Sequence, residues 1–327
     1  MFELSASNAG QYLAQRPETA GRRWRITPLE GGVSNTVLLA ESDGARIVLK
    51  QALAKLRVKE DWYADRSRIR RECAALRRLA PLLAPGAVPR IVLEDEENHL
   101  FAMEAAPAGA RTWKALLLEG RAPIEIAESV GAMTATMLRQ SWGSLEWEQL
   151  FGDQAAFDQL RLDPYYRFTA RRHPELAPQF EERIELARRR RALVHGDWSP
   201  KNFLVWGDRV TAIDFEVIHY GDPSFDAAFL LNHLLLKSFF RPQWAPQYAA
   251  SARRFLEIVA EAVPAPAEFE ATTLRHLGCL LLARIDGKSP VEYIQEEGLK
   301  AKIRSFARSL ILRPPSSVAA VFASIPS

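Results

Sequence analysis

The chain contains few cysteines. Only Cys73 and Cys279 occur among its 327 residues, and neither belongs to a Cys-x-x-Cys pair. A disulfide framework needs several cysteines, and a thiolate zinc site needs them in closely spaced pairs. The sequence therefore excludes both kinds of site and is typical of a protein from a reducing compartment.

The chain also lacks a large excess of charge of either sign. Its 43 lysines and arginines nearly balance its 40 acidic residues, and the net charge is +3. A nucleic-acid-binding protein normally has a concentrated basic face. The dense basic run at residues 188–191 is explained by a solvated helix end before an apolar strand. We therefore expect no nucleic-acid partner.

Long hydrophobic runs are absent too. The most apolar segments, residues 227–236 and 277–283, are much shorter than the ~20 residues that cross a bilayer. The beginning of the chain has no basic stretch followed by an apolar one, as a signal peptide would have. These absences predict a cytoplasmic protein with no membrane partner.

Two kinds of pattern follow one another along the chain. Up to residue 104, short β-type runs are separated by turn signals such as Asp43-Gly44, and one helical pattern covers residues 59–83. The expected strands are residues 25–29, 36–40, 46–51, 90–94 and 99–103. Beyond residue 110 helical patterns dominate, at residues 112–118, 124–139, 155–160, 178–191, 226–236, 247–263, 268–283 and 291–312.

The segment between these two regions is rich in alanine, proline and glycine, which is typical of a linker. The sequence therefore predicts an α+β protein with two lobes. Residues 1–104 form a β-rich N-lobe, residues 105–110 a hinge, and residues 111–327 a mostly helical C-lobe. Ligands are expected in the cleft between the lobes.

One segment of the C-lobe, residues 192–214, does not have a helical pattern and carries polar residues at the spacing of a catalytic loop. Between apolar runs, His195 and Gly196 precede Asp197, and Asn202 follows five positions later; Asp214 comes after the next apolar run. Phosphoryl transfer needs a carboxylate that orients the acceptor hydroxyl and oxygen ligands for Mg²⁺. Asp197 is the candidate for the first task, and Asn202 and Asp214 are the candidates for the second. An Asx-rich surface turn without chemistry is the alternative.

The pattern His-Gly-Asp-x-x-x-x-Asn, followed by Asp214-Phe-Glu and by Gly221-Asp-Pro-Ser-Phe-Asp226, resembles the aminoglycoside phosphotransferase family. The same superfamily includes choline, methylthioribose, homoserine and fructosamine kinases. The resemblance implies a protein-kinase-like fold that binds ATP and Mg²⁺ between its lobes. It also implies that Asp226 opens a helix and braces the catalytic loop, and that His195 helps to shape this loop.

The same resemblance assigns nucleotide-binding roles in the N-lobe. Residues 31–35, with Gly32 and Ser34, lie between the first two strands and are expected to touch phosphates. Lys50 ends the run Ile-Val-Leu-Lys, and Glu72 on the next helix is its expected partner; Glu60 and Asp61 are alternatives. The backbone at Glu104 and Ala106 is expected to contact the adenine. Taken singly, the pair Gly31-Gly32 is more typical of a turn. Lys50 taken singly is more typical of a solvated lysine at the end of a strand.

The acceptor site is expected among the C-lobe helices. Trp198 directly follows the candidate catalytic aspartate and is the first candidate to wall the pocket, with core packing as the alternative. His233 and Asp286 are further candidates. The alternatives are a histidine of the core for His233 and a polar turn between helices for Asp286. Residues 264–327 contain eight basic and six acidic residues, which disfavours a polycationic aminoglycoside. A small hydroxylated metabolite, such as a sugar or an amino alcohol, is therefore at least as well supported.

Two other functions compete with a small-molecule kinase. A protein kinase is disfavoured because only 12 positions separate Asp214 from Asp226, which leaves no room for a peptide-positioning segment. A catalytically inactive, nucleotide-binding scaffold of the same fold is the second alternative. It is disfavoured because the residues that such a scaffold usually loses are all present: Lys50, Asp197, Asn202 and Asp214. The sequence does not indicate the oligomeric state.

Overall fold

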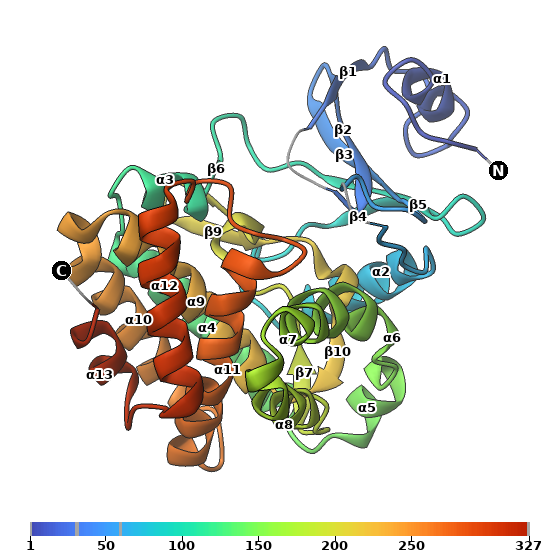
Figure 1. Cartoon of the computed structure of the whole chain (residues 1–327). Helices are drawn as coiled ribbons and strands as arrows, with labels where there is room; N and C mark the ends of the chain where they lie inside the picture. The colour runs from blue at the N-terminus through green and yellow to red at the C-terminus, as the bar shows by residue number, and fades with distance from the viewer. Residues whose placement is uncertain (1, 30–32, 59–60, 326–327) are drawn as a thin grey trace. The chain divides into compact units, whose positions relative to one another are not determined.

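A computed structural model describes residues 2–29, 33–58 and 61–325 (Figure 1). The chain divides into two compact units. The first contains residues 1–110 together with 211–217, and the second contains residues 111–210 and 218–327. The segment 211–217 thus belongs to the first unit, although the sequence analysis assigned it to the C-lobe, because it packs against helix α2.

The first unit is built on a five-stranded antiparallel sheet in the order β1-β2-β3-β5-β4. Strands β2 and β3 form the hairpin predicted at Asp43-Gly44, where Gly44 has a φ of +72° that favours glycine. The strands are β1 (Arg25–Pro28), β2 (Asn35–Ser42), β3 (Ala45–Ala52), β4 (Ile91–Asp95) and β5 (Leu100–Glu104).

Two helices accompany this sheet. Helix α1 (Ala9–Ala14) buries Tyr12 and Leu13 against sheet residues such as Leu38 and Leu49, and each buried leucine stabilises the fold by ~1.5–3 kcal/mol. Helix α2 (Arg68–Leu79) is shorter than the predicted helix 59–83. It begins late because the backbone before it is paired elsewhere: Ala64 N–H donates to the Ala54 carbonyl at 3.1 Å, and the Trp62 carbonyl accepts from Leu56 N–H at 2.9 Å.

The second unit is mainly helical. Helix α9 is buried along almost its whole length and packs against α10 and α11, which explains its nearly unbroken apolar sequence. The helices are α3 (Trp113–Leu118), α4 (Ile124–Ser141), α5 (Leu145–Phe151), α6 (Ala155–Phe157), the π-helix η1 (Asp158–Arg167), α7 (Phe168–Arg172), α8 (Ala177–Ala187), α9 (Ser224–Phe240), α10 (Ala245–Ala260), α11 (Pro266–Asp286), α12 (Glu297–Leu312) and α13 (Val318–Ala323). Short 3-10 helices of this unit lie at Pro174–Leu176, Pro200–Asn202 and Pro242–Trp244, and a further one, Phe215–Val217, belongs to the first unit.

Short strands frame the segment that carries the motif. Strands β7 (Ala192–Val194) and β10 (His219–Gly221) pair antiparallel on either side of it. Strands β6 (Arg111–Thr112), β8 (Phe203–Trp206) and β9 (Arg209–Ala212) form a second small sheet, and β9 runs across the limit between the units. The predicted helix 178–191 ends earlier, at Ala187, so that the arginine run follows the helix.

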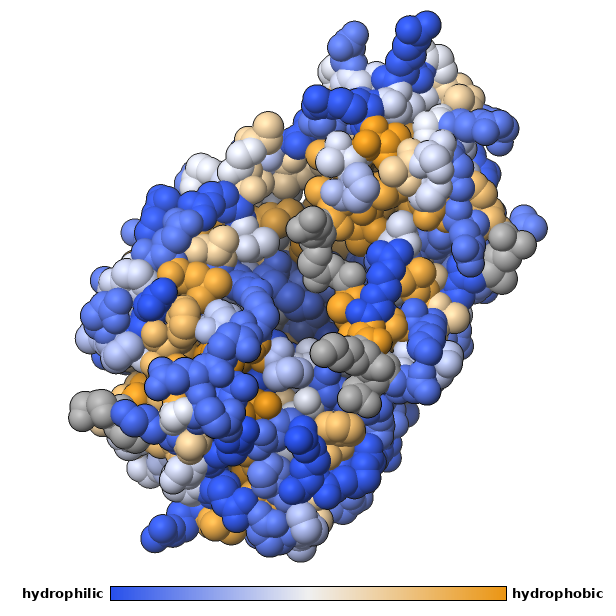
Figure 2. All heavy atoms as spheres, turned by 45° about the horizontal axis from the view of Figure 1, so that its top comes forward, coloured by the Kyte–Doolittle hydropathy of each residue, from blue (hydrophilic) through white to orange (hydrophobic). Residues whose placement is uncertain are grey.

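None of the helices in the described part of the chain has the length and apolar character needed to cross a membrane. On the face shown in Figure 2, hydrophilic residues predominate and hydrophobic residues form smaller patches between them.

Candidate functional site

The first unit brings together a lysine and two acidic residues that the sequence analysis had selected. Lys50 lies near the end of the central strand β3, and Glu72 lies one turn into α2. Lys50 Nζ is 2.7 and 2.9 Å from the two carboxylate oxygens of Glu72, and 2.5 Å from Asp214 Oδ1. The expected pairing of Lys50 with Glu72 is therefore present. Of the alternatives, Asp61 pairs with Lys55, and residue 60 lies outside the described residues.

A second buried ion pair, which the sequence analysis missed, lies beside the first. Arg68 Nε is 2.9 Å from Glu216 Oε2, and Glu216 also accepts hydrogen bonds from Ser34 Oγ at 2.6 Å and Asn35 Nδ2 at 2.9 Å. Arg68 precedes Glu72 by four positions and so lies on the same face of α2. The spacing of Arg68 and Glu72, and the acidic residue two positions after Asp214, were the features of the sequence that could have indicated this second ion pair.

In this cluster Glu72 and Asp214 contact Lys50, and Glu216 contacts Arg68. Burial by itself lowers the pKa of Lys50, but Asp214 and Glu72 outweigh it and raise that pKa. Burial raises the pKa of Glu72, and the neighbouring carboxylates add to this while Lys50 opposes it. The two carboxylates thus hold the proton on Lys50, while burial is the main reason for the raised pKa of Glu72.

Asp214 is the most accessible carboxylate of the three. Its side chain is 22% exposed, against 0% for Glu72 and 5% for Glu216. Its φ of +70° is unusual for a residue other than glycine, and strain of this kind is concentrated at functional sites. The next amide, Phe215 N–H, donates to Glu72 Oε1 at 3.2 Å and so ties the segment to α2. The geometry makes Asp214 the carboxylate best placed to meet a ligand.

The remaining nucleotide-binding candidates are Gly32, Ser34, Glu104 and Ala106, and the structure describes all of them except Gly32. Gly32 lies outside the described residues. The Ser34 hydroxyl donates its hydrogen bond to Glu216. At the predicted hinge, Glu104 N–H donates to the Arg90 carbonyl at 2.9 Å, and the Ala106 carbonyl accepts from Arg46 at 2.6 Å. A nucleotide contact at Glu104 or Ala106 would therefore use their other backbone atoms.

In the second unit, Asp226 holds the loop that follows β7. Its carboxylate accepts hydrogen bonds from the backbone N–H groups of His195 at 2.6 Å and Gly196 at 2.8 Å. Burial raises the pKa of Asp226 to about 7, although these two hydrogen bonds oppose the rise. Gly196 has a φ of +78°, which glycine adopts without strain. Asp226, near the start of α9, is thus placed as a brace of the loop.

The loop is also closed by bonds within itself. Asp197 N–H donates to His195 Nδ1 at 3.1 Å, and Asn202 Nδ2 donates to the Asp197 carbonyl at 2.9 Å. The 3-10 turn Pro200–Asn202 lies between these bonds. His195, Asp197 and Asn202 therefore form one compact loop, in which the Asn202 side-chain oxygen is not used by this contact.

Two cations contact the Asp197 carboxylate. Arg161 Nη2 is 2.9 Å and Lys201 Nζ 2.8 Å from Asp197 Oδ2. Arg161 also donates from Nε to the Gly196 carbonyl at 2.7 Å. Opposite charges at these distances favour the ionised form of a carboxylate. Arg161 was missed because it lies in the π-helix η1, 36 positions before Asp197, where no sequence pattern marks it.

The three candidates for the acceptor site lie in different surroundings. Trp198 is 1% exposed, and its indole N–H donates to Thr134 Oγ1 at 2.9 Å, which favours the core-packing alternative. Asp286 accepts from Arg304 at 3.0 Å and lies 2.9 Å from His173 Nε2, in an ion network between helices. His233 lies on α9; burial and nearby cations lower its pKa well below the usual value, so the ring is neutral.

Lys237, one turn after His233 on α9, is 1% exposed, and burial lowers the pKa of its ammonium group to about 7. The charged groups that act on it are Lys114 and Arg284, which lower the pKa further, and Glu292, which raises it. Because the unfolded chain holds the proton more tightly, stability should rise with pH from about 7 to 10. At pH 7 the buried amine should cost ~4 kcal/mol.

We therefore expect Lys237→Met to be more stable than the wild type at pH 7, with a difference that shrinks as the pH approaches 10. Urea unfolding of both proteins at several pH values measures this. Lys302→Met, at an exposed position of α12, is the control for loss of one positive charge. A stability difference that does not change with pH would contradict the lowered pKa.

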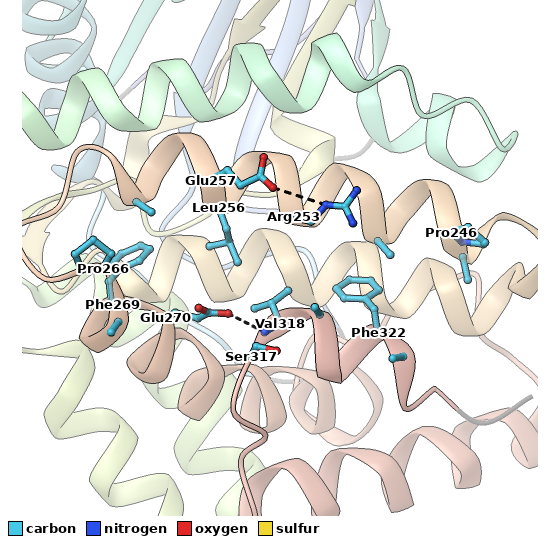
Figure 3. A pocket seen from close by; sticks show the side chains of 16 residues that line it. Pro246, Arg253, Leu256, Glu257, Pro266, Phe269, Glu270, Ser317, Val318 and Phe322 are labelled. Atoms are coloured by element: carbon cyan, nitrogen blue, oxygen red, sulfur yellow. Dashed lines mark hydrogen bonds and ion pairs between the residues drawn. The ribbon is translucent and has the colours of Figure 1, made fainter.

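A groove of about 750 Å³ lies elsewhere in the second unit, between α10, α11 and the start of α13 (Figure 3). Its lining is largely apolar, with Leu256, Phe269 and Phe322 among its residues. Its polar groups are satisfied within the groove: Arg253 pairs with Glu257, and Glu270 accepts from the Val318 amide. No residue selected from the sequence lines it.

Comparison with known proteins gives consistent results. A model of the phosphotransferase enzyme family matches residues 25–269. Methylthioribose kinase of Escherichia coli O45:K1 (strain S88 / ExPEC) is 28% identical over 278 residues, which cover 74% of this chain and 66% of that kinase. The chain thus spans slightly less than two thirds of the length of this relative.

Two solved structures share the fold. APH(2″)-IIa in a ternary complex with streptomycin and ATP has a TM-score of 0.52 at 16% identity, over 98% of this chain and 99% of that one. A choline/ethanolamine kinase family protein from Mesorhizobium loti has a TM-score of 0.53 at 18% identity, over 97% and 99%. The α+β, protein-kinase-like fold expected from the sequence is confirmed.

Proposed function

Since this chain belongs to the phosphotransferase enzyme family, we propose that it is a kinase that transfers the γ-phosphate of ATP to a hydroxyl group of a small molecule. The observation that carries the proposal is the position of Lys50, whose ammonium group contacts both Glu72 and Asp214. Kinases of this fold use a strand lysine, held by a helix glutamate, for the nucleotide phosphates, and a nearby aspartate for the metal.

The residues present suit a nucleotide with Mg²⁺. Mg²⁺ prefers oxygen ligands and is commonly held by one or two protein groups together with substrate phosphates. Asp214 in the first unit and Asn202 in the second would supply such oxygens, and Asp214 is the most accessible carboxylate of the cluster around Lys50. When bound, Mg²⁺ would neutralise charge on the phosphates during transfer. Lys50 would add a fixed positive charge, and Glu72 would keep it in position.

Asp197 is proposed to act on the acceptor. Its carboxylate, which Arg161 and Lys201 contact, would accept a hydrogen bond from the acceptor hydroxyl and orient its oxygen. The oxygen then forms a bond to the γ-phosphorus, the bond to the bridging oxygen breaks, and ADP leaves. The hydroxyl proton passes to Asp197. Asp226 and His195 contribute by holding the loop in shape.

The relatives suggest where to look for the acceptor. One is named a methylthioribose kinase and another a choline/ethanolamine kinase family protein, so a sugar and an amino alcohol are the first candidates. An aminoglycoside is a third candidate, because APH(2″)-IIa is solved with streptomycin. We propose a small hydroxylated metabolite as the general class.

An ADP-release assay with ATP and Mg²⁺ tests the proposal. Wild-type protein is incubated with a panel of sugars including methylthioribose, sugar acids, amino alcohols and aminoglycosides. We expect acceptor-dependent ADP release with at least one class. Thermal stabilisation by ATP and Mg²⁺ without turnover on any member would instead favour an inactive nucleotide-binding scaffold. Absence of both effects would contradict the nucleotide site itself.

A further inference from the structure

Two buried cations in the second unit differ from all the others. Among the described residues, six lysines and arginines are buried, and four of them pair with a carboxylate: Lys50, Arg68, Arg161 and Arg183. Lys237 on α9 and Arg284 on α11 have no acidic partner in the described part of the chain. Lys237 Nζ reaches only the His233 carbonyl, at 3.3 Å. Arg284 donates to neutral oxygens of Tyr165 and Ser289.

A buried charge without a counter-ion is costly, and proteins rarely keep one unless it has a use. Two further polar atoms in this region also lack a partner among the described residues: Arg284 Nε and the Tyr293 hydroxyl oxygen. The Tyr293 ring lies beside Lys237, whose Nζ is 5.4 Å from the ring centroid. These groups together offer the N–H and O–H donors, and the positive charge, that an oxyanion requires.

This donor cluster adjoins the candidate catalytic loop through one aromatic ring. Arg284 Nη1 donates to Tyr165 Oη at 3.0 Å, and the Arg161 guanidinium lies 5.7 Å from the centre of the same ring. Arg161 in turn contacts the Asp197 carboxylate. An acceptor held at Lys237 and Arg284 would therefore lie on the Asp197 side of the second unit.

The charges around the cluster reinforce its positive character. Although burial raises the pKa of the Tyr165 hydroxyl, Arg284 and Arg161 outweigh it and lower that pKa. Lys114 on α3 also lowers the pKa of Lys237, and it pairs with Glu292. Glu292 is the acidic group that acts on Lys237, and the cations Lys114, Lys237 and Arg284 outnumber it. A polycationic acceptor would be repelled here, whereas an acceptor with a negative group would be attracted.

We propose that the acceptor carries a carboxylate or a phosphate, and that Lys237, Arg284 and the Tyr293 hydroxyl bind this anionic group. The inference rests on the proposed kinase function and specifies its substrate class: a hydroxy acid or the phosphate ester of a polyol. It separates this chain from kinases whose acceptors are neutral sugars or cationic amino alcohols.

Binding without nucleotide tests the anion site independently of catalysis. Isothermal titration is carried out with two acid–alcohol pairs, D-gluconate against D-glucitol and glucose 6-phosphate against glucose, and with inorganic phosphate as a probe that needs no particular carbon skeleton. We expect the anionic member of at least one pair, or phosphate itself, to bind about tenfold or more tightly than the neutral compounds. The two pairs distinguish a carboxylate from a phosphate ester.

Tyr293→Phe is the sharpest variant, because the hydroxyl that it removes has no partner among the described residues. It should leave thermal stability unchanged or raised and weaken anion binding roughly tenfold. Lys237→Met should weaken it further, and Lys302→Met on the surface of α12 is the matched control.

Equal affinity for acid, phosphate and alcohol in the wild type overturns the proposal, as does equal anion affinity in Tyr293→Phe, Lys237→Met and the control. The outcome for the kinase function is separate. Anion binding without any ADP release would leave the anion site standing and contradict the kinase. ADP release with neutral sugars or amino alcohols, at rates equal to those with the acids, would support the kinase function and contradict the anion site.

Discussion

Replacing Asp197 by alanine should lower kcat by ~10²–10⁴-fold, the usual contribution of a group that orients or accepts a proton in the transition state. The reason is local. Asp197 is the carboxylate at the centre of the loop, contacted by Arg161 and Lys201 and held through the backbone by Asn202. Steady-state kinetics with an acceptor identified from the panel measures the effect. The affinity for ATP with Mg²⁺, followed by thermal shift, should change little.

Removal of this carboxylate also removes its contacts with Arg161 and Lys201, which could destabilise the loop. The experiment must therefore distinguish a loss of stability from a loss of catalysis. Asp197→Asn keeps the shape of the side chain and should lose nearly as much kcat. Asp208→Asn, at an exposed turn after β8, is the matched control and should behave as the wild type. Turnover close to that of the wild type in Asp197→Ala would remove Asp197 from the mechanism.

Replacing Lys50 by methionine should have the second large effect, on stability as well as on nucleotide binding. The change leaves Glu72 buried without the ammonium group that it contacts through both oxygens. Breaking a buried ion pair by removing one partner typically costs ~3–5 kcal/mol. Urea unfolding should show this loss, and stabilisation by ATP with Mg²⁺ should disappear.

A double variant distinguishes the ion pair from packing. In Lys50→Met/Glu72→Leu no charge of the pair is left buried alone, so its loss of stability should be smaller than the sum of the single losses. Nucleotide binding should remain absent in it. Lys55→Met removes a lysine from an exposed pair with Asp61 and should leave stability nearly unchanged. Stabilisation by nucleotide that survives in Lys50→Met would contradict the proposed nucleotide site.

Much of this protein could be predicted from local order along the chain. The β-type runs, the Asp43-Gly44 turn and the later helical patterns led to the correct fold class, because strand and helix periods are short-range properties. The spacing of Asp197 and Asn202 on one loop, and the sequence Ile-Val-Leu-Lys50 before a helix with Glu72, identified residues that the structure places in contact within each unit. Errors arose at boundaries: α2 begins at Arg68 because backbone hydrogen bonds pair Trp62 and Ala64 with other residues.

The partners of charged groups, in contrast, were decided only by the tertiary structure. Arg68 and Glu216 lie 148 positions apart, and Lys50 and Asp214 lie 164 apart, so no short-range pattern connects them. Which charges remain without a counter-ion is a property of the packed molecule alone. The low number of cysteines, a small net charge and a few ordered motifs determined by themselves the class of protein. Only packing decided that Trp198 belongs to the core and that Lys237 and Arg284 are buried with no acidic partner among the described residues, because burial and pairing depend on residues that folding brings together.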